Sequence, residues 1–130
     1  MDQNLPIAIK KYIEVWTERR IENIDEVLSN KHILHTGADT ITDKKLIKQY
    51  INERFNAFPD IQYQVTDSII QGDKYCFLWE ARGTHKGVLK AIPPTGKSFY
   101  YSGVAIHKLT DDKIGETWIY SNIYEMLERM

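Results

Sequence analysis

Apolar residues recur at every third or fourth position over the first half of the chain, which is the spacing of amphipathic helices. One helix is predicted over residues 4 to 20, with Asn4 as its N-cap and Pro6 in its first turn. Its apolar stripe consists of Ile9, Tyr12, Ile13 and Trp16. Because charged residues lie off this stripe, we expect the helix to pack one face against a core.

A second, shorter helix is predicted from Asn23 to about residue 29, because Asn23 and Glu26 have the spacing of a capping box. We expect this helix to fold back on the first. Residues 31 to 36 favour a brief strand, and residues 37 to 41 favour a loop.

A third helix is predicted to begin after Thr42, which is a suitable N-cap. Pro59 ends it, because the proline ring disfavours helical geometry at the preceding residue, Phe58. Its apolar positions keep helical spacing and are Leu46, Ile47, Tyr50, Ile51, Phe55 and Phe58. The first half of the chain is therefore predicted to be helical, with amphipathic faces to bury.

Beyond Pro59 the period of the apolar residues changes from about 3.6 to about 2, which predicts strands. In the first of them, Ile61, Tyr63, Val65 and Ile69 share a face. Long strands are expected at residues 61–70, 75–84, 98–109 and 114–123. Helices followed by strands indicate an α+β fold, in which three helices pack on one face of a curved antiparallel sheet of four long strands and a short one.

The predicted strand at residues 98–109 has apolar side chains on both of its faces. Tyr101 and Ala105 lie on one face, and Val104 and Ile106 lie on the other. A face in contact with solvent should be mostly polar. We therefore expect a homodimer that forms through the outer face of the sheet.

The composition narrows the class of partner. Lys and Arg number 17 against 18 Asp and Glu, a net charge of -1, so the chain has no electrostatic footprint for nucleic acid or an anionic membrane. Cys76 is the only cysteine, which favours a reducing compartment. No segment has the character of a signal peptide or of a membrane span of about 18 apolar residues. A single cytoplasmic domain over residues 1–130 is expected, with no nucleic-acid or membrane partner.

Five short segments in the C-terminal two-thirds carry a family resemblance. They are FNAFPD at the end of the third helix, Gly72-Asp73 in the first hairpin turn, GTHKG, IPPTGK and KIGETW. In this order they resemble the SnoaL-like polyketide cyclase (ester cyclase) family of the NTF2-like superfamily. The resemblance implies an NTF2-like cone, in which a strongly curved sheet wraps around helices and leaves a deep apolar cavity. It also implies a dimer or higher oligomer, with neither a metal nor an organic cofactor.

The resemblance implies a reaction as well, namely ring closure of an aromatic polyketide methyl ester by an intramolecular aldol step. The family's general acid/base is an aspartate four residues after a tryptophan, and after Trp118 that position is Asn122 in this chain. A neutral amide can hydrogen-bond an enolate oxygen but exchanges no proton near neutral pH. The expected acid/base substitutes are His85, His35 and Glu116.

Strand alternation puts Glu116, Trp118 and Asn122 on one face of the last strand, and the resemblance turns that face toward the cavity. The residues expected to bind a ligand are Tyr12, Trp16, Phe55, Phe58, Trp79, Tyr101, His107, Trp118 and Asn122. The competing structural interpretation is that the aromatic residues are core packing units and that the histidines hydrogen-bond the backbone and fix loops.

A metal site and a phosphate site both lack support. His35, His85 and His107 follow no short metal-ligand spacing, and Ala91 stands where a P-loop ending at Ser98 would need its first glycine. The sequence predicts a cavity protein that binds a small, largely apolar carbonyl compound, with cofactor-free cyclase or isomerase chemistry. The alternatives are a non-enzymatic ligand-binding or dimerisation module, and another NTF2-like enzyme such as a dehydratase.

Overall fold

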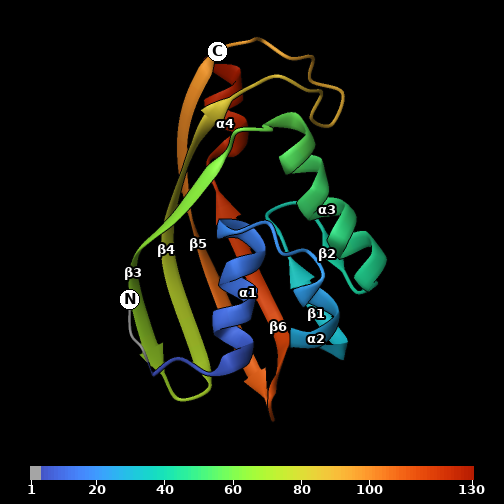
Figure 1. Ribbon diagram of the computed structural model, residues 1–130, viewed down its shortest axis with the longest axis vertical. Helices are drawn as coiled ribbons and strands as arrows, with labels where there is room; N and C mark the ends of the chain where they lie inside the picture. Colours follow the sequence, from blue (N-terminus) through green and yellow to red (C-terminus); the bar gives the residue numbers. More distant parts are fainter. Residues whose placement is uncertain (1–3) are drawn as a thin grey trace.

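The computed structural model describes residues 4–130 as one six-stranded sheet with helices packed on its concave side (Figure 1). The helices are α1 (Ile7–Thr17), α2 (Asn23–Val27), α3 (Lys44–Ala57) and α4 (Ile123–Glu128). The strands are β1 (Leu28–His35), β2 (Thr40–Ile41), β3 (Gln62–Gln71), β4 (Lys74–Thr84), β5 (Ser98–Thr110) and β6 (Lys113–Ser121). The predicted α+β class is confirmed, and β2 and α4 are additions to the predicted elements.

The strand order is β2-β1-β6-β5-β4-β3, with long antiparallel pairing between β3, β4, β5 and β6. The pair formed by β1 and β6 is parallel, so the prediction of a purely antiparallel sheet was wrong at this point. The two strands are far apart in sequence. Strand β1 follows α2 directly, and it lies beside β6, the last strand of the chain. Figure 1 shows α1 lying across the middle of this sheet.

A side chain at the start of α2 bonds to α1 instead of capping its own helix. No side-chain cap bond starts α2, so the predicted capping box was wrong. Instead, the buried amide of Asn23 donates a hydrogen bond of 3.0 Å to the backbone carbonyl of Lys11 in α1. This bond holds α2 against α1, as the predicted fold-back requires.

Helix α3 begins one residue later than predicted. Asp43, not Thr42, is its N-cap, and its carboxylate accepts a 2.7 Å hydrogen bond from the backbone N–H of Lys45. The helix ends at Ala57, two residues before Pro59, as predicted from the proline. At this end of α3, the carbonyl of Ala57 accepts hydrogen bonds from the β4–β5 connection.

Two β-bulges decide which side chains enter the core. The pairing of β3 with β4 shifts around Thr66, and that of β6 with β5 shifts around Gly115. An extra residue in a strand reverses the alternation beyond it. Ile69 therefore points outward and is 62% exposed, although the sequence pattern placed it with Tyr63 on the inner face. A Cβ on Gly115 would lie 2.4 Å from the Oγ1 of Thr110, so only glycine fits this bulge as built.

The outer face of the sheet carries a row of side chains that crosses five strands. Paired residues place His35, Trp118, Ile106, Cys76 and Ile69 side by side along this row, from β1 to β3. A second row holds Tyr120, Val104 and Leu78. Within the described residues no helix covers these rows, because the helices pack on the concave side.

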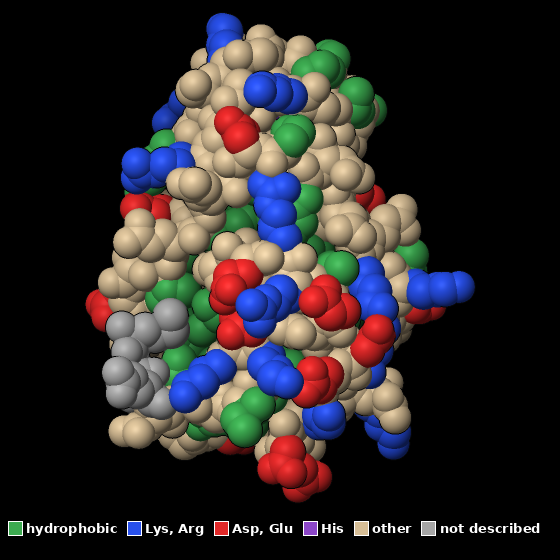
Figure 2. All heavy atoms as spheres, viewed as in Figure 1, with side chains coloured by type: hydrophobic (Ala, Val, Ile, Leu, Met, Phe, Trp, Pro, Cys, Tyr) green, Lys and Arg blue, Asp and Glu red, His purple; other side chains and the backbone are tan. Residues whose placement is uncertain are grey.

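The helical side of the molecule has a mixed charge. Figure 2 shows Lys and Arg interspersed with Asp and Glu over this face, without a large area of one sign. No helix within residues 4–130 has the length and apolar character that a membrane span needs.

Candidate functional site

A cavity lies between α1, α3 and the concave face of the sheet. Its volume open to the centre of a water molecule is about 60 Å³. This is well below the roughly 300–1,000 Å³ of ordinary ligand pockets, so the cavity is a small one. Its lining is mostly aromatic and aliphatic, and comprises Tyr12, Ile13, Trp16, Thr17, Tyr50, Arg54, Tyr63, Gln64, Val65, Phe77, Trp79, Tyr101, Ala105, His107, Ile119 and Ser121.

Two tryptophans form the walls of the cavity. Trp16 comes from α1 and Trp79 from β4, and both contact the ring of Tyr63 edge to face, with centroids 5.0 and 5.8 Å away. Gly103 in β5 makes this possible, because a Cβ there would lie 2.4 Å from the indole of Trp79. The missing side chain lets that indole lie close against the sheet.

One end of the cavity carries a histidine with a polar network behind it. The Nδ1 of His107 and the Nε2 of His32 each lie 2.9 Å from the hydroxyl of Thr117. All three side chains are buried. Burial lowers the pKa of His107 to about 3 and that of His32 to about 4, because an imidazolium ion there would lose its hydration. Both imidazoles are therefore neutral at physiological pH.

The Thr117 hydroxyl links the tautomers of the two histidines. A hydroxyl has one proton to donate, so Thr117 donates to one imidazole and accepts from the N–H of the other. A change of tautomer at His107 therefore requires a change of tautomer at His32 as well, because both rings carry their proton on Nδ1 in one arrangement and on Nε2 in the other. Next to His107, Tyr12 packs its ring at a centroid distance of 4.3 Å, and its hydroxyl accepts a 3.1 Å bond from the indole N–H of Trp16.

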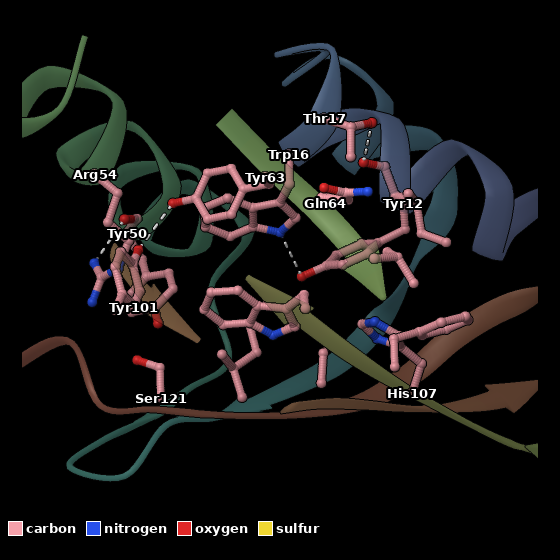
Figure 3. A pocket seen from close by; sticks show the side chains of 16 residues that line it. Tyr12, Trp16, Thr17, Tyr50, Arg54, Tyr63, Gln64, Tyr101, His107 and Ser121 are labelled. Atoms are coloured by element: carbon pink, nitrogen blue, oxygen red, sulfur yellow. Dashed lines mark hydrogen bonds between the residues drawn. The ribbon is translucent and has the colours of Figure 1, made fainter. Parts of the chain in front are cut away.

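The opposite end of the cavity carries Arg54 and a group of tyrosines (Figure 3). The Arg54 guanidinium lies over the ring of Tyr50, 3.7 Å from the centroid, and donates a 3.0 Å bond to the Tyr50 carbonyl. The hydroxyls of Tyr63 and Tyr101 lie 3.3 Å apart. Burial raises the pKa of Tyr101 to about 12 and that of Tyr63 well above its usual value, so both phenols keep their protons.

No aspartate or glutamate lines the cavity among the described residues. The tyrosines there stay protonated and Arg54 stays charged, so both supply hydrogen-bond donors. His107 is thus the cavity group able to take up a proton. The site can stabilise an oxygen that gains negative charge, and it has one weak base.

Five residues predicted to bind a ligand lie in this lining. They are Tyr12, Trp16, Trp79, Tyr101 and His107. Their role in binding stays a prediction. Phe55 and Phe58 lie outside the lining and pack in the core, Phe55 against the Trp16 ring at 5.8 Å and Phe58 against the Phe99 ring at 4.5 Å.

His85 fixes a loop and does not line the cavity. It is fully buried, its backbone N–H donates to the carbonyl of Lys97 at 3.0 Å, and its Nδ1 lies 3.4 Å from the hydroxyl of Thr95. Its ring packs edge-on against Phe58. These contacts agree with the structural interpretation of this histidine and remove it from the site.

The other two acid/base candidates, His35 and Glu116, and Trp118 lie away from the cavity. The predicted face of β6 was wrong, because the bulge at Gly115 turns Thr117 inward and Glu116 and Trp118 outward. On the outer face, the Nε2 of His35 lies 2.6 Å from a Glu116 carboxylate oxygen, and its ring stacks on Trp118.

Asn122 lies at the start of α4, and its side-chain oxygen accepts a 3.1 Å bond from the backbone N–H of Ser102. It is exposed and absent from the lining, so the predicted position beside a ligand was wrong. The neighbouring Ser121 lines the cavity in its place.

Sequence reasoning missed Arg54, Tyr63, His32 and Thr117. A signal for Arg54 was present, because it follows Ile51 by three positions on the apolar stripe of α3, where a charge is unexpected. No such signal marks Thr117, whose burial depends on the bulge in β6. Within residues 4–130, no three His, Cys, Asp or Glu side chains gather in the manner of a metal site.

The fold is shared with several solved structures. The chain is similar to IdmH from Streptomyces antibioticus, a candidate polyketide cyclase, with 24% identity, a TM-score of 0.78 and 94% coverage of both chains. A candidate SnoaL-like polyketide cyclase from Jannaschia sp. CCS1 has 14% identity and a TM-score of 0.82, over 96% of this chain and 94% of that one. AclR from Streptomyces galilaeus, a candidate hydroxylase, has 18% identity and a TM-score of 0.80, over 95% of this chain and 80% of that one.

No curated protein matches the chain by sequence. The family model of SnoaL-like polyketide cyclases matches residues 7–129, which is nearly the whole chain. Together with the curved sheet that wraps around α1 and α3, this match identifies the chain as a member of the SnoaL-like polyketide cyclase family.

Proposed function

We propose that the cavity binds a small, largely apolar carbonyl compound and promotes proton transfer at the carbon beside its carbonyl group, without a cofactor. The observation that carries this proposal is a neutral imidazole, that of His107, in the wall of an otherwise aromatic cavity. A ring fits between Trp16 and Trp79, and a carbonyl oxygen finds hydrogen-bond donors at either end of the cavity.

The network behind His107 supports a proton relay. Nδ1 of His107 is engaged with Thr117, which leaves Nε2 as its free nitrogen. When Nε2 takes a proton from the substrate carbon, Nδ1–H donates its proton to Thr117, and the Thr117 hydroxyl donates its own proton to His32. The electron pair of the broken C–H bond moves to the carbonyl oxygen as an enolate, and the reverse shifts return the proton. The added proton is then held as an imidazolium ion at His32, whose pKa of about 4 favours its return along the same path.

The position of the family's aspartate has no part in this proposal. Asn122 lies outside the cavity lining and holds the backbone of Ser102. We therefore expect Asn122→Asp to leave proton transfer unchanged.

A second candidate function is binding without turnover. The absence of a carboxylate from the described lining favours it, because an imidazole with a pKa near 3 is a weak base. Such a protein would store or sense its ligand.

Deuterium exchange separates the two functions. Phenylacetone, a ketone with one ring, is incubated with the protein in D₂O, and loss of the proton signals beside its carbonyl is followed by NMR. A positioned base typically contributes about 10²- to 10⁴-fold in rate. We expect catalysed exchange that His107→Gln removes and that His35→Gln, on the outer face, retains. Binding without exchange would support storage or sensing, and neither binding nor exchange would contradict both functions.

The pH profile of the exchange adds a second criterion. Because the pKa of His107 is about 3, this base stays neutral and the rate should be flat between about pH 5 and 8. A rate that falls through an ordinary histidine titration near pH 6.5 would instead implicate an exposed histidine.

We also propose a homodimer through the outer face of the sheet. The row from His35 to Ile69 and the row with Leu78 leave large apolar side chains partly in solvent, including Tyr120 at 50% exposure and Leu78 at 38%. The face spans five strands at about 4.8 Å each, which is broad enough for a two-fold contact between copies. The cavity lies on the concave side of the sheet, so a contact through the outer face does not involve its lining.

A further inference from the structure

Among residues 4–130, Arg54 is the only lysine or arginine whose side chain is buried, at 6% exposure. Its position is the polar end of the cavity, beside Tyr50 and Tyr101 and opposite Tyr12 and His107 (Figure 3). Arginine keeps its charge in any protein environment, so burial leaves a permanent cation in the wall of an apolar cavity. A buried charge is costly unless a partner neutralises it.

The protein supplies Arg54 with an incomplete set of partners. Its contacts are the ring of Tyr50, at 3.7 Å, and the Tyr50 carbonyl, at 3.0 Å. No aspartate or glutamate in the described part of the chain forms an ion pair with it. Its place in the last turn of α3 offsets some of the cost, because the end of a helix carries a partial negative charge. A partial charge does not neutralise a full one.

The neighbouring tyrosines add donors and no negative charge. Tyr63 and Tyr101 stay protonated, and in their 3.3 Å pair one hydroxyl donates to the other. The proton of the accepting hydroxyl remains available for a third group. Together with the guanidinium N–H groups that do not bond the Tyr50 carbonyl, this proton gives the end of the cavity several donors in a lining without a carboxylate among the described residues. A carboxylate has the complementary chemistry, because it only accepts and fits a guanidinium with two oxygens.

We infer that the cavity takes an acid: a small compound with one ring and a carboxylate that pairs with Arg54. This inference rests on the proposed binding function and names the ligand class for the same site. With the carboxylate at Arg54, the ring lies between Trp16 and Trp79. An aromatic keto acid has both parts.

The test compares an acid with its neutral ester on the same protein. Phenylpyruvate and methyl phenylpyruvate are titrated into the full chain by calorimetry. Since a hydrogen bond to a charged group contributes more than a neutral one, we expect the acid to bind about ten- to a hundredfold more tightly. Arg54→Met should remove this preference and leave ester binding in place. Arg20→Met, which changes an exposed arginine, should retain the preference.

Stability distinguishes a ligand-binding role for Arg54 from a structural one. Replacing an unpaired buried charge with an apolar side chain should leave the ligand-free protein as stable as before, or more so. A large loss of thermal stability in Arg54→Met would show that Arg54 serves the fold and would overturn the inference. The comparison of acid and ester in the unaltered chain needs no variant.

The outcomes separate this inference from the proposed function. If the ester binds as tightly as the acid, the inference fails and the proposed function stands. If neither compound binds, both fail. A preference for the acid that persists in Arg54→Met would place the anion at another residue and would also overturn the inference.

Discussion

At the scale of single residues, the main feature of this protein is a set of polar groups buried with incomplete partners. Thr117 satisfies one nitrogen of His32 and one of His107, while Nδ1 of His32 has no partner among the described residues. Such groups cost free energy unless they are hydrogen-bonded. His32 lies behind the cavity, whereas His85, whose Nε2 also has no partner among the described residues, lies in the β4–β5 connection. A core built only for stability avoids such groups.

The buried histidines should make stability depend on pH. In the folded protein the pKa values of His107 and His32 are about 3 and about 4, against about 6.5 in an unfolded chain. The unfolded state therefore binds more protons below about pH 6.5, so stability is fully present above that pH and falls as the pH drops toward the folded values. Between pH 7 and pH 5 the loss should be on the order of 2 kcal/mol for each histidine.

Urea unfolding at these two pH values measures this effect. His32→Gln should reduce the difference in unfolding free energy between them, whatever its effect at pH 7. Leu46→Gln, which alters an exposed side chain and no titratable group, should leave the difference unchanged. Equal stability of the unaltered chain at pH 5 and pH 7 would contradict the burial of neutral histidines.

At the scale of elements, the bulges explain where sequence reasoning succeeded and where it could not. Tyr12 and Trp16 were predicted correctly to lie on the core-facing stripe of α1, because a helix has a continuous 3.6-residue period. Trp118 was placed on the wrong face because an inserted residue reverses the alternation of side chains beyond it. No feature of the segment KIGETW indicates that Gly115 is the inserted residue. The existence of each long strand could be predicted, but the face of β6 depended on its register with β5.

The β4–β5 connection is an element held by backbone bonds. Lys86 and Gly87 donate backbone N–H groups to the carbonyl of Ala57, at the end of α3. A Cβ on Gly87 would lie 2.5 Å from the carbonyl oxygen of Asn56, so glycine permits this close approach. His85 holds the start of the loop by a backbone bond to Lys97, so hydrogen bonds keep the loop against the end of α3.

The tip of this loop is a strained turn, and glycine should relax it. Lys90 and Ala91 have φ values of 44° and 66° in a two-residue turn between Leu89 and Ile92. A residue with a Cβ is disfavoured in this left-handed region. We expect Ala91→Gly to raise the unfolding free energy by about 0.5–1 kcal/mol.

The control for this change is Ala38→Gly, in an exposed loop without a positive φ. There glycine only adds freedom to the unfolded chain, and stability should fall slightly. Thermal unfolding of the two variants side by side checks the assignment, and Ala91→Gly proving no more stable than Ala38→Gly would refute the strained turn.

At the scale of the whole molecule, the two faces of one curved sheet have different proposed roles. Its concave face and α1 and α3 enclose the cavity, while its outer face carries the apolar rows proposed as a dimer contact. The α+β order and the family could be read from the sequence because both depend on the succession of elements. The position of the site could not, since it depends on which side chains the curvature brings together.

The dimer contact can be tested with two substitutions of equal chemistry. Leu78→Glu places a charge among the apolar rows, and Ile7→Glu places one on the exposed side of α1, where Ile7 is 71% exposed. We expect analytical ultracentrifugation to give twice the chain mass for the unaltered protein and for Ile7→Glu, and the mass of one chain for Leu78→Glu. A dimer that survives Leu78→Glu would place the contact elsewhere.

Ligand binding inside the cone can be followed separately at each of the three tryptophans of the chain. Trp16 and Trp79 line the cavity, whereas Trp118 lies on the outer face. Phenylpyruvate titrated into ¹⁵N-labelled protein should shift the indole N–H resonances of Trp16 and Trp79 in a saturable way and leave that of Trp118 in place. Unchanged Trp16 and Trp79 signals, or a shift confined to Trp118, would contradict the proposed site.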